Sequence, residues 1–250
     1  MRRALIIGID DYDAADGLTA CCMDAKSMAA LLSANEDGSE NFQCVTLLSG
    51  VAADDRITPR PERAVIKHYA AKLLAPGCDL ALFYFAGHGV VEDSGGYLLA
   101  CDSVSADDSL AMRDLIALAN RSSVREILFI LDCCHAGAIG AALEPGELAL
   151  LRCGVTILSA SMSSQPALSS GGHGVFTQLL CAALSGEAAD SRGRVTSASV
   201  YTFVDGALSW WQQRPVYKAH ISNLSTLRRC HPRSSAGPPS KPVRVRGEIP

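Results

Sequence analysis

The stretch Arg125–Asp132 (REILFILD) runs directly into Cys133-Cys134-His135-Ala136-Gly137, and it decides the fold. Its apolar residues are almost continuous, which is typical of a strand buried on both faces of a parallel sheet. Asp79–Ala86 (DLALFYFA) has the same character and ends in Gly87-His88-Gly89. Ligands bind at the carboxyl ends of parallel strands, so the two strands predict one sheet with a Cys and a His at its functional edge.

Outward from these two strands, apolar runs alternate with stretches of helical character. Further strands are predicted at Ala4–Asp10, Gln43–Ser49, Tyr97–Ala100, Val155–Ser159 and Val216–Ile221. Helices are predicted at Thr19–Ser33 (capped by Thr19), Thr58–Ala75 (with Pro59 and Pro61 in its first turn), Leu110–Asn120, Phe176–Leu184 and Ser197–Trp211. This alternation predicts an α/β fold, a three-layer sandwich whose mostly parallel central sheet is covered by helices on both faces.

The composition indicates one folded domain over residues 1–230, followed by a flexible tail. The chain of 250 residues is 48% hydrophobic and 19% charged, which is typical of a globular protein. Residues 231–250 are rich in Pro, Ser and Gly and offer little to bury. The net charge is −4 and the tail is basic, so the body is acidic. An acidic body argues against nucleic acid as a partner and is compatible with basic substrates.

Cysteine usage and the amino-terminal sequence predict a cytoplasmic protein with reduced thiols. The ten cysteines would suggest disulfides in a small secreted protein. However, the apolar run Ala4–Ile9 is too short for the central region of a signal peptide. No run reaches the length of about 18 apolar residues that a membrane span needs, so we expect no membrane association.

The chemistry expected at the strand ends is nucleophilic catalysis by Cys134 with His88 as its base. An imidazole titrates near neutral pH and can take the proton of a thiol, which then attacks a carbonyl carbon. Backbone N–H groups of Gly89 and Cys134 are the expected donors to the resulting oxyanion. Strand alternation puts Asp132 and Cys134 on one face and Cys133 on the other, as a buried apolar residue.

These motifs resemble those of caspase-like cysteine peptidases, on the metacaspase and bacterial caspase-like side. The resemblance rests on Tyr84–Gly89 (YFAGHG) and Asp132–Gly137 (DCCHAG), and it extends over about residues 1–230. His88 precedes Cys134 by 46 residues, and caspases carry their histidine about 50 residues before the cysteine. Weaker matching blocks are Cys22-Met23-Asp24-Ala25, Ser159-Ala160-Ser161 and Gly174-Val175-Phe176-Thr177.

The resemblance implies a cysteine endopeptidase that cuts after Arg or Lys. Caspases proper select aspartate with basic residues and carry Gln-Ala-Cys, whereas metacaspases have acidic residues at the positions of Asp24 and Asp132. Two carboxylates facing one guanidinium in a partly dry pocket would explain such a preference. Ser161 is expected to line the substrate cleft.

The resemblance also raises the question of cofactors and regulation. Some relatives bind calcium through aspartates in the region of Asp102, Asp107 and Asp108, but the spacing is compressed here and favours a solvated acidic loop. We therefore expect no required cofactor, with calcium as the open alternative, and no zinc site.

Related proteins are regulated effectors of bacterial cell death or antiphage defence, some of them activated by a small nucleotide signal. The short stretch Ala138–Arg152 leaves autoprocessing open.

Two alternatives stay open from the sequence. The chain could be an inactive caspase-like binding or scaffold module, although His88 and Cys134 are both present. It could also be a caspase-like peptidase with another cut preference. His135 is predicted to point away from Cys134, and His173 lies in a glycine-rich loop, so both are interpreted as structural.

Overall fold

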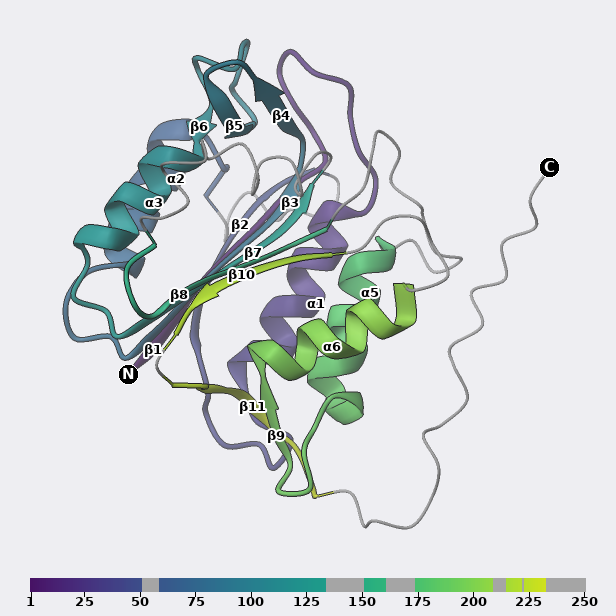
Figure 1. Ribbon diagram of the computed structural model, residues 1–250. Coiled ribbons are helices and arrows are strands. Elements are labelled where there is room, and N and C mark those ends of the chain that lie inside the picture. Colours follow the sequence, from purple (N-terminus) through teal and green to yellow (C-terminus); the bar gives the residue numbers. More distant parts are fainter. Residues whose placement is uncertain (51–58, 134–150, 161–173, 209–214, 222, 233–250) are drawn as a thin grey trace.

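The computed structural model describes residues 1–50, 59–133, 151–160, 174–208, 215–221 and 223–232. Its centre is a six-stranded sheet with the strand order β10-β8-β7-β3-β1-β2 (Figure 1). The strands are β1 (Arg2–Ile9), β2 (Gln43–Ser49), β3 (Leu80–Gly87), β7 (Glu126–Cys133), β8 (Val155–Ser159) and β10 (Val216–His220). Only the edge strand β10 runs antiparallel to its neighbour. The predicted, mostly parallel sheet is confirmed.

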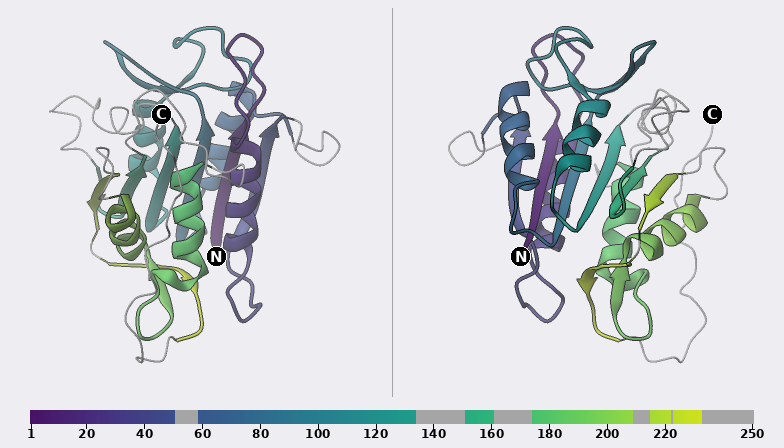
Figure 2. Two further views of the ribbon diagram at one scale, coloured as in Figure 1. Left: turned by 90° about the vertical axis from the view of Figure 1, so that its right-hand side faces the viewer. Right: turned by 60° about the vertical axis from the view of Figure 1, so that its left-hand side comes forward.

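Helices cover both faces of the sheet and complete the three layers (Figure 2). One face packs against α2 (Arg63–Leu73) and α3 (Met112–Arg121). The other face packs against α1 (Cys21–Ser33), α5 (Val175–Ala182), a π-helical turn (Ala183–Glu187) and α6 (Ser197–Leu208). Successive residues of β3 enter opposite layers: Phe83 contacts Phe129 on the first face, and the fully buried Tyr84 lies on the second. The continuous apolar runs follow from this burial on both sides.

Two small antiparallel sheets lie at opposite ends of the central one (Figures 1 and 2). Near the carboxyl ends of the parallel strands are β4 (Gly89–Glu92), β5 (Gly95–Leu98) and β6 (Leu110–Ala111). At the other end are β9 (Arg194–Thr196) and β11 (Thr226–Arg229). Of these five strands only the one near Tyr97 was expected, because strands of two to four residues are too short to show a period.

The start of α1 corrects the predicted cap. The helix begins at Cys21 and no side chain at its N-cap position bonds to it, so Thr19 is not the cap. Asp10, at the end of β1, accepts the N–H groups of Cys21 and Cys22 at 2.8 and 3.2 Å instead. A carboxylate at a helix N-terminus satisfies free donors and complements the helix dipole. Here the cap comes from a neighbouring strand, which local sequence patterns cannot reveal.

Helix α2 is shorter than predicted at its amino end. It begins at Arg63, so Pro61 precedes the helix and does not lie in its first turn. Asp102 accepts the N–H of Arg63 at 2.8 Å and caps the helix from a distant loop. Pro59 also precedes the helix, and Thr58 lies outside the described residues. The predicted tail, residues 231–250, lies almost wholly outside the described ranges and stays a prediction.

Candidate active site

The register of the sheet places the two motif-bearing strands side by side. In the parallel pairing of β3 with β7, Ala86 lies opposite Asp132 and Gly87 opposite Cys133. His88 follows directly after Gly87, and Cys134 follows directly after Cys133 in the sequence. Cys134 and Ser161 themselves lie outside the described residues, as do His135 and His173. The two strands that lead to His88 and Cys134 are therefore adjacent, as the sequence predicted.

Strand alternation continues to the end of β7. Cys133 is 6% exposed and packs among the apolar residues of the α2 and α3 layer. Leu128 and Ile130 belong to the layer of α1, α5 and α6, and Asp132 continues this face toward α5. The described part of the strand agrees with the interpretation of Cys133 as a core residue.

His88 is oriented by the segment that follows β1. Its Nε2 lies 2.8 Å from the carbonyl oxygen of Asp16, which can only accept a hydrogen bond. Nε2 must then carry the proton, so in the neutral ring Nδ1 is the basic nitrogen. The hydroxyl of Tyr12 accepts the backbone N–H of His88 at 2.7 Å, and the two rings lie 4.8 Å apart. This arrangement fixes the position of the ring and its tautomer, and the role of His88 as a general base stays a prediction.

Gly87 and Gly89 shape the backbone around His88. A side chain at Gly87 would meet the hydroxyl of Tyr12 and the ring of Phe85, so the glycine is needed for the close approach of Tyr12. Gly89 is buried at the start of β4 and pairs with Leu98. The oxyanion role of its N–H group stays a prediction.

Asp24 and Asp132 come together although they are far apart in the sequence. Asp24 lies in the first turn of α1 and is 2% exposed, and Asp132 lies near the end of β7. Both carboxylates face Gly174: a Cβ atom added to that glycine would lie 3.0 Å from Asp24 Oδ2 and 3.3 Å from Asp132 Oδ2. The N–H of Gly174 also donates to Asp24 Oδ2 at 3.0 Å. The two aspartates that the resemblance pairs therefore lie close together, and their role in binding a basic side chain stays a prediction.

The placement of α1 explains how Asp24 reaches this position. A side chain at Gly8 would collide with the backbone of Cys21, so the glycine lets α1 approach β1 closely. The cap from Asp10 then holds the first turn of the helix at the carboxyl end of the sheet. The same turn carries Asp24.

The environment of the pair is acidic and partly dry, because Asp24 is buried and Asp132 is half-buried. Burial raises the pKa of Asp132 to about 7; a hydrogen bond from Thr177 lowers it, and the charge of Asp24 raises it. Burial, together with both aspartates, raises the pKa of the Cys181 thiol to about 12. The pKa of the Cys21 thiol is also raised, most by burial, next by the charge of Asp10 and then by the two carboxylates of the pair. These two thiols are therefore poor nucleophiles, and the pair favours a cation.

The acidic loop near β5 offers no metal cluster within the described ranges. Asp102 caps α2, and Asp108 accepts a hydrogen bond from Ser105 at 3.3 Å. No group of three or more His, Cys, Asp or Glu residues that could hold a metal ion occurs in the described part of the chain. None of its helices combines the length and apolar character needed to cross a membrane.

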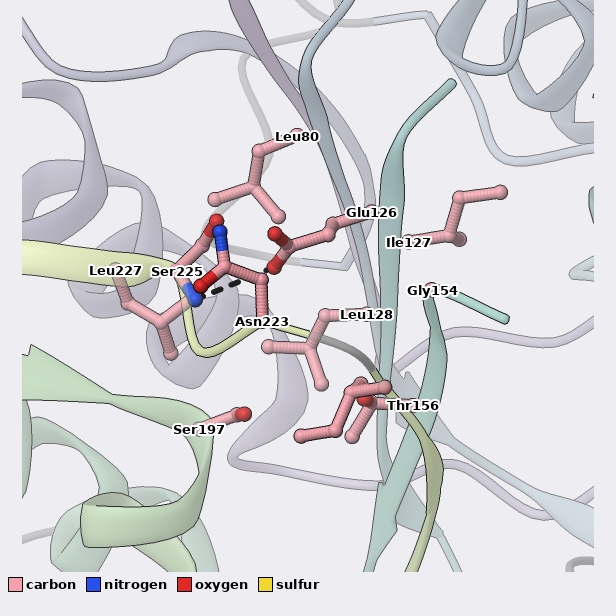
Figure 3. Close-up of a pocket in the computed structure, with 11 residues that line it drawn as sticks. Leu80, Glu126, Ile127, Leu128, Gly154, Thr156, Ser197, Asn223, Ser225 and Leu227 are labelled. Carbon is pink, nitrogen blue, oxygen red and sulfur yellow. Dashed lines mark hydrogen bonds between the residues drawn. The ribbon is translucent and has the colours of Figure 1, made fainter. Parts of the chain in front are cut away.

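A polar pocket lies at the opposite end of the sheet, where Glu126 begins β7 (Figure 3). Glu126 Oε2 accepts the N–H of Ser225 at 3.3 Å, and Asn223 lies beside it. The cavity has a volume of about 10 Å³, which is room for about one water molecule. It is too small for a peptide side chain and is far from the ends of β3 and β7 that lead to the catalytic motifs.

Comparisons with known proteins identify the family. The sequence model of the caspase domain, peptidase family C14, matches residues 1–227. The chain belongs to this family. Metacaspase-2 and metacaspase-3 of Trypanosoma brucei brucei are each 30% identical to this caspase-domain chain over 156 residues. These matches cover 55% of the chain but only 42% and 41% of the two metacaspases, so the chain spans less than half of either relative.

A solved structure supports the caspase-like fold independently. The crystal structure of a protein from Geobacter sulfurreducens superposes with a TM-score of 0.60 and is 18% identical. The match covers 89% of this chain and 94% of that protein. The resemblance and fold class expected from the sequence are thus confirmed.

Several residues of the site were missed by sequence reasoning. Tyr12 and the carbonyl of Asp16 gave no signal, because they lie in an irregular segment after β1. Tyr84 and Thr177 stand inside blocks that carried the resemblance, but no spacing rule links them. Their roles depend on contacts between β3, α5 and β7.

Proposed function

We propose that this caspase-domain protein is a cysteine endopeptidase that cuts peptide chains after Arg or Lys. One observation carries the proposal: Asp24 and Asp132 converge on Gly174 beside the strand end that leads to Cys134. A planar guanidinium or an ammonium group matches two such carboxylates in charge and in hydrogen-bonding capacity. The family membership supports peptide-bond hydrolysis as the reaction.

The proposed mechanism uses the geometry around His88. Nδ1 of His88 takes the proton of the Cys134 thiol, and the thiolate attacks the carbonyl carbon of the residue held by the acidic pair. The N–H groups of Gly89 and Cys134 stabilise the oxyanion. The C–N bond breaks as His88 returns the proton to the leaving amine, and water then hydrolyses the thioester. The Asp16 carbonyl supports this sequence because it holds the Nε2 proton throughout. Ser161 is the proposed neighbour of the substrate in the cleft.

The proposed biological role is that of a cytoplasmic regulated effector in bacterial cell death or antiphage defence, with a small nucleotide as its activating signal. It is supported by the family resemblance alone. The proposal includes no required cofactor. Whether calcium changes the rate is tested by measuring peptide cleavage with and without it.

The direct test measures cleavage of fluorogenic peptides that end in Arg, Lys, Asp or Ala, with and without calcium. We expect release from the Arg and Lys peptides only. Cys134→Ala abolishes it, and Cys133→Ala retains most of it, because Cys133 is a core residue. Alkylation by iodoacetamide, located by mass spectrometry, reports the reactivity of Cys134 separately from that of the exposed Cys153. Cleavage that survives Cys134→Ala, or cleavage after Asp alone, contradicts the proposal; an unreactive Cys134 points to a binding module.

A further inference from the structure

A buried chain of hydroxyl groups leads to Asp132, one of the two carboxylates that face Gly174. The hydroxyl of Thr177 on α5 lies 2.6 Å from Asp132 Oδ2, and the hydroxyl of Tyr84 on β3 lies 2.6 Å from the same Thr177 oxygen. Tyr84 and Thr177 are both fully buried. The chain thus joins three elements of the fold, β3, α5 and β7, behind the pocket.

The chemistry of the groups sets the direction of these hydrogen bonds. An ionised carboxylate only accepts, so Thr177 donates its single hydroxyl hydrogen to Asp132. Thr177 then has no hydrogen left for Tyr84, so Tyr84 must donate to Thr177. Every hydrogen in the chain points toward Asp132. Aligned hydrogen bonds polarise one another, and each stabilises the ionised form of the terminal acceptor.

Reversing the chain would be less favourable. A protonated Asp132 could donate to Thr177, and Thr177 to Tyr84, but the Tyr84 hydrogen would then lose its acceptor within this chain. Leaving a buried donor without a partner costs about 1–3 kcal/mol. The chain therefore opposes the two influences that favour a neutral Asp132, which are burial and the charge of Asp24.

We propose that Thr177 and Tyr84 are positioning residues for recognition of the basic side chain: they keep the Asp132 carboxylate ionised and turned toward Asp24, so that both carboxylates accept from one guanidinium. This proposal deepens the proposed function and rests on it for the identity of the substrate. The ionisable groups around Asp132 come from each neighbouring element, namely Asp24 and Cys21 on α1, Tyr84 on β3 and Cys181 on α5.

The experiment compares Thr177→Val, Thr177→Ser and Tyr84→Phe with the wild-type protein. The first readout is KM and kcat for an Arg peptide between pH 5.5 and 8.5. The second is the affinity for agmatine, a small guanidinium compound, measured by calorimetry over the same range. Agmatine binding does not require Cys134, so it tests the pocket whether or not the chain cleaves peptides. Thr202→Val is the matched control, because the hydroxyl of the exposed Thr202 donates to the carbonyl of Ala198 within α6 at 3.0 Å.

Thr177→Val is expected to weaken agmatine binding about tenfold near pH 7 and to raise KM by a similar factor, with kcat little changed. The pH at which binding reaches half its maximum moves upward, because an Asp132 that has lost its donor ionises less readily. Tyr84→Phe shifts both quantities less, in the same direction. Thr177→Ser retains most of the wild-type behaviour, because the hydroxyl is kept.

The outcomes separate the two proposals. If the wild-type protein cleaves Arg peptides while Thr177→Val keeps its KM, its agmatine affinity and its pH midpoint, the positioning role is wrong and the peptidase proposal stands. If no Arg or Lys peptide is cleaved but Thr177→Val still weakens agmatine binding, the positioning role stands and the peptidase proposal is wrong. Should Thr177→Val fold poorly, the Tyr84→Phe midpoint decides: an unshifted value overturns the positioning role.

Discussion

Strand β7 carries a carboxyl group at each end, and the two ends differ in what surrounds them. Glu126, at the start, is 9% exposed and accepts one N–H from Ser225; its Oε1 has no hydrogen-bond partner among the described residues. The cavity beside it has room for about one water molecule. Asp132, near the other end, accepts a hydroxyl bond from Thr177 and faces a second carboxylate across Gly174.

The comparison teaches that burial of a carboxyl group does not by itself mark a binding site. Burial and the charge of Arg229 lower the pKa of Arg2, whereas the nearby carboxylate of Glu126 raises it. The charge of Glu126 is therefore partly balanced by Arg2 inside the fold. Asp132 and Asp24 instead place two like charges together, which costs stability in the unliganded protein. Such a cost is typical of a functional site, where the binding of a cationic ligand removes the repulsion between the two carboxylates.

The largest expected effect comes from neutralising Asp132, with the carboxyl group at the other end of β7 as the control. Asp132→Asn is expected to lower kcat/KM for an Arg peptide about a hundred- to a thousandfold, because the basic side chain of the substrate loses one of its two carboxylate partners. Glu126→Gln, its matched control, is expected to stay within about twofold of the wild type. The measurement is steady-state cleavage of the Arg peptide. Equal losses in both variants would remove the distinction between the two ends.

Gly174→Ala tests whether the space between the carboxylates is the binding site. The added methyl group would lie 3.0 and 3.3 Å from the two carboxylate oxygens, and a displaced ligand can lose up to about a hundredfold. We expect KM for Arg peptides to rise about ten- to a hundredfold. The backbone of Gly174 (φ −65°, ψ 137°) is open to alanine, so a change in Tm would report the close contact of the methyl group with the two carboxylates and not backbone strain. Gly206→Ala is the control, because among the described residues outside its own helix backbone the added Cβ would meet no atom within 4 Å. An unchanged KM in Gly174→Ala would place the ligand elsewhere.

The pH dependence of agmatine binding tests the charge state of the pair. Asp132 has a pKa raised to about 7 in the folded protein, so it binds a proton below that pH and competes with a guanidinium. Affinity is expected to rise with pH, by at most about tenfold per unit, and to level off above about 7. Asp132→Asn should lose this slope. A flat wild-type profile would mean that Asp132 is already ionised at low pH.

The same raised pKa has the opposite consequence for the stability of the unliganded protein. The unfolded chain loses the Asp132 proton near pH 4, whereas the folded protein keeps it until about pH 7. Asp132 therefore contributes stability at low pH that is lost as the pH rises between these values. The Tm of wild type relative to Asp132→Asn should fall across this window. A constant difference would contradict the raised pKa.

The smallest expected effect is that of Tyr12→Phe, which tests whether His88 acts independently of the two carboxylates. Tyr12→Phe removes the acceptor of the His88 N–H and should lower kcat about fivefold, the equivalent of one hydrogen bond. It should leave the ratio of Arg to Lys cleavage and the agmatine affinity unchanged, since the hydroxyl of Tyr12 bonds to the backbone of His88. A changed Arg to Lys ratio would show that the two parts of the site are not independent.

Long apolar runs allowed much of the fold to be predicted. The strands at Gln43–Ser49 and Val155–Ser159 match residue for residue, and the other central strands differ by one or two residues at one or both ends. The short strands β4, β6, β9 and β11 were missed, because each forms by pairing with another strand and the local sequence does not predict that partner. The caps of α1 and α2 were missed for the same reason: both come from aspartates outside the helix.

The amino-acid sequence by itself determined the alternation of strands and helices, the family, and which residues can carry peptidase chemistry. It did so because burial on two faces and glycine-flanked Cys and His residues leave local patterns. Only the tertiary structure decided that Asp24 and Asp132 both face Gly174, that Asp16 and Tyr12 orient His88, and that hydrogen bonds link Tyr84 to Asp132 through Thr177. Such contacts depend on strand register and on how closely α1 and α5 pack against the sheet, and these are properties of the whole fold.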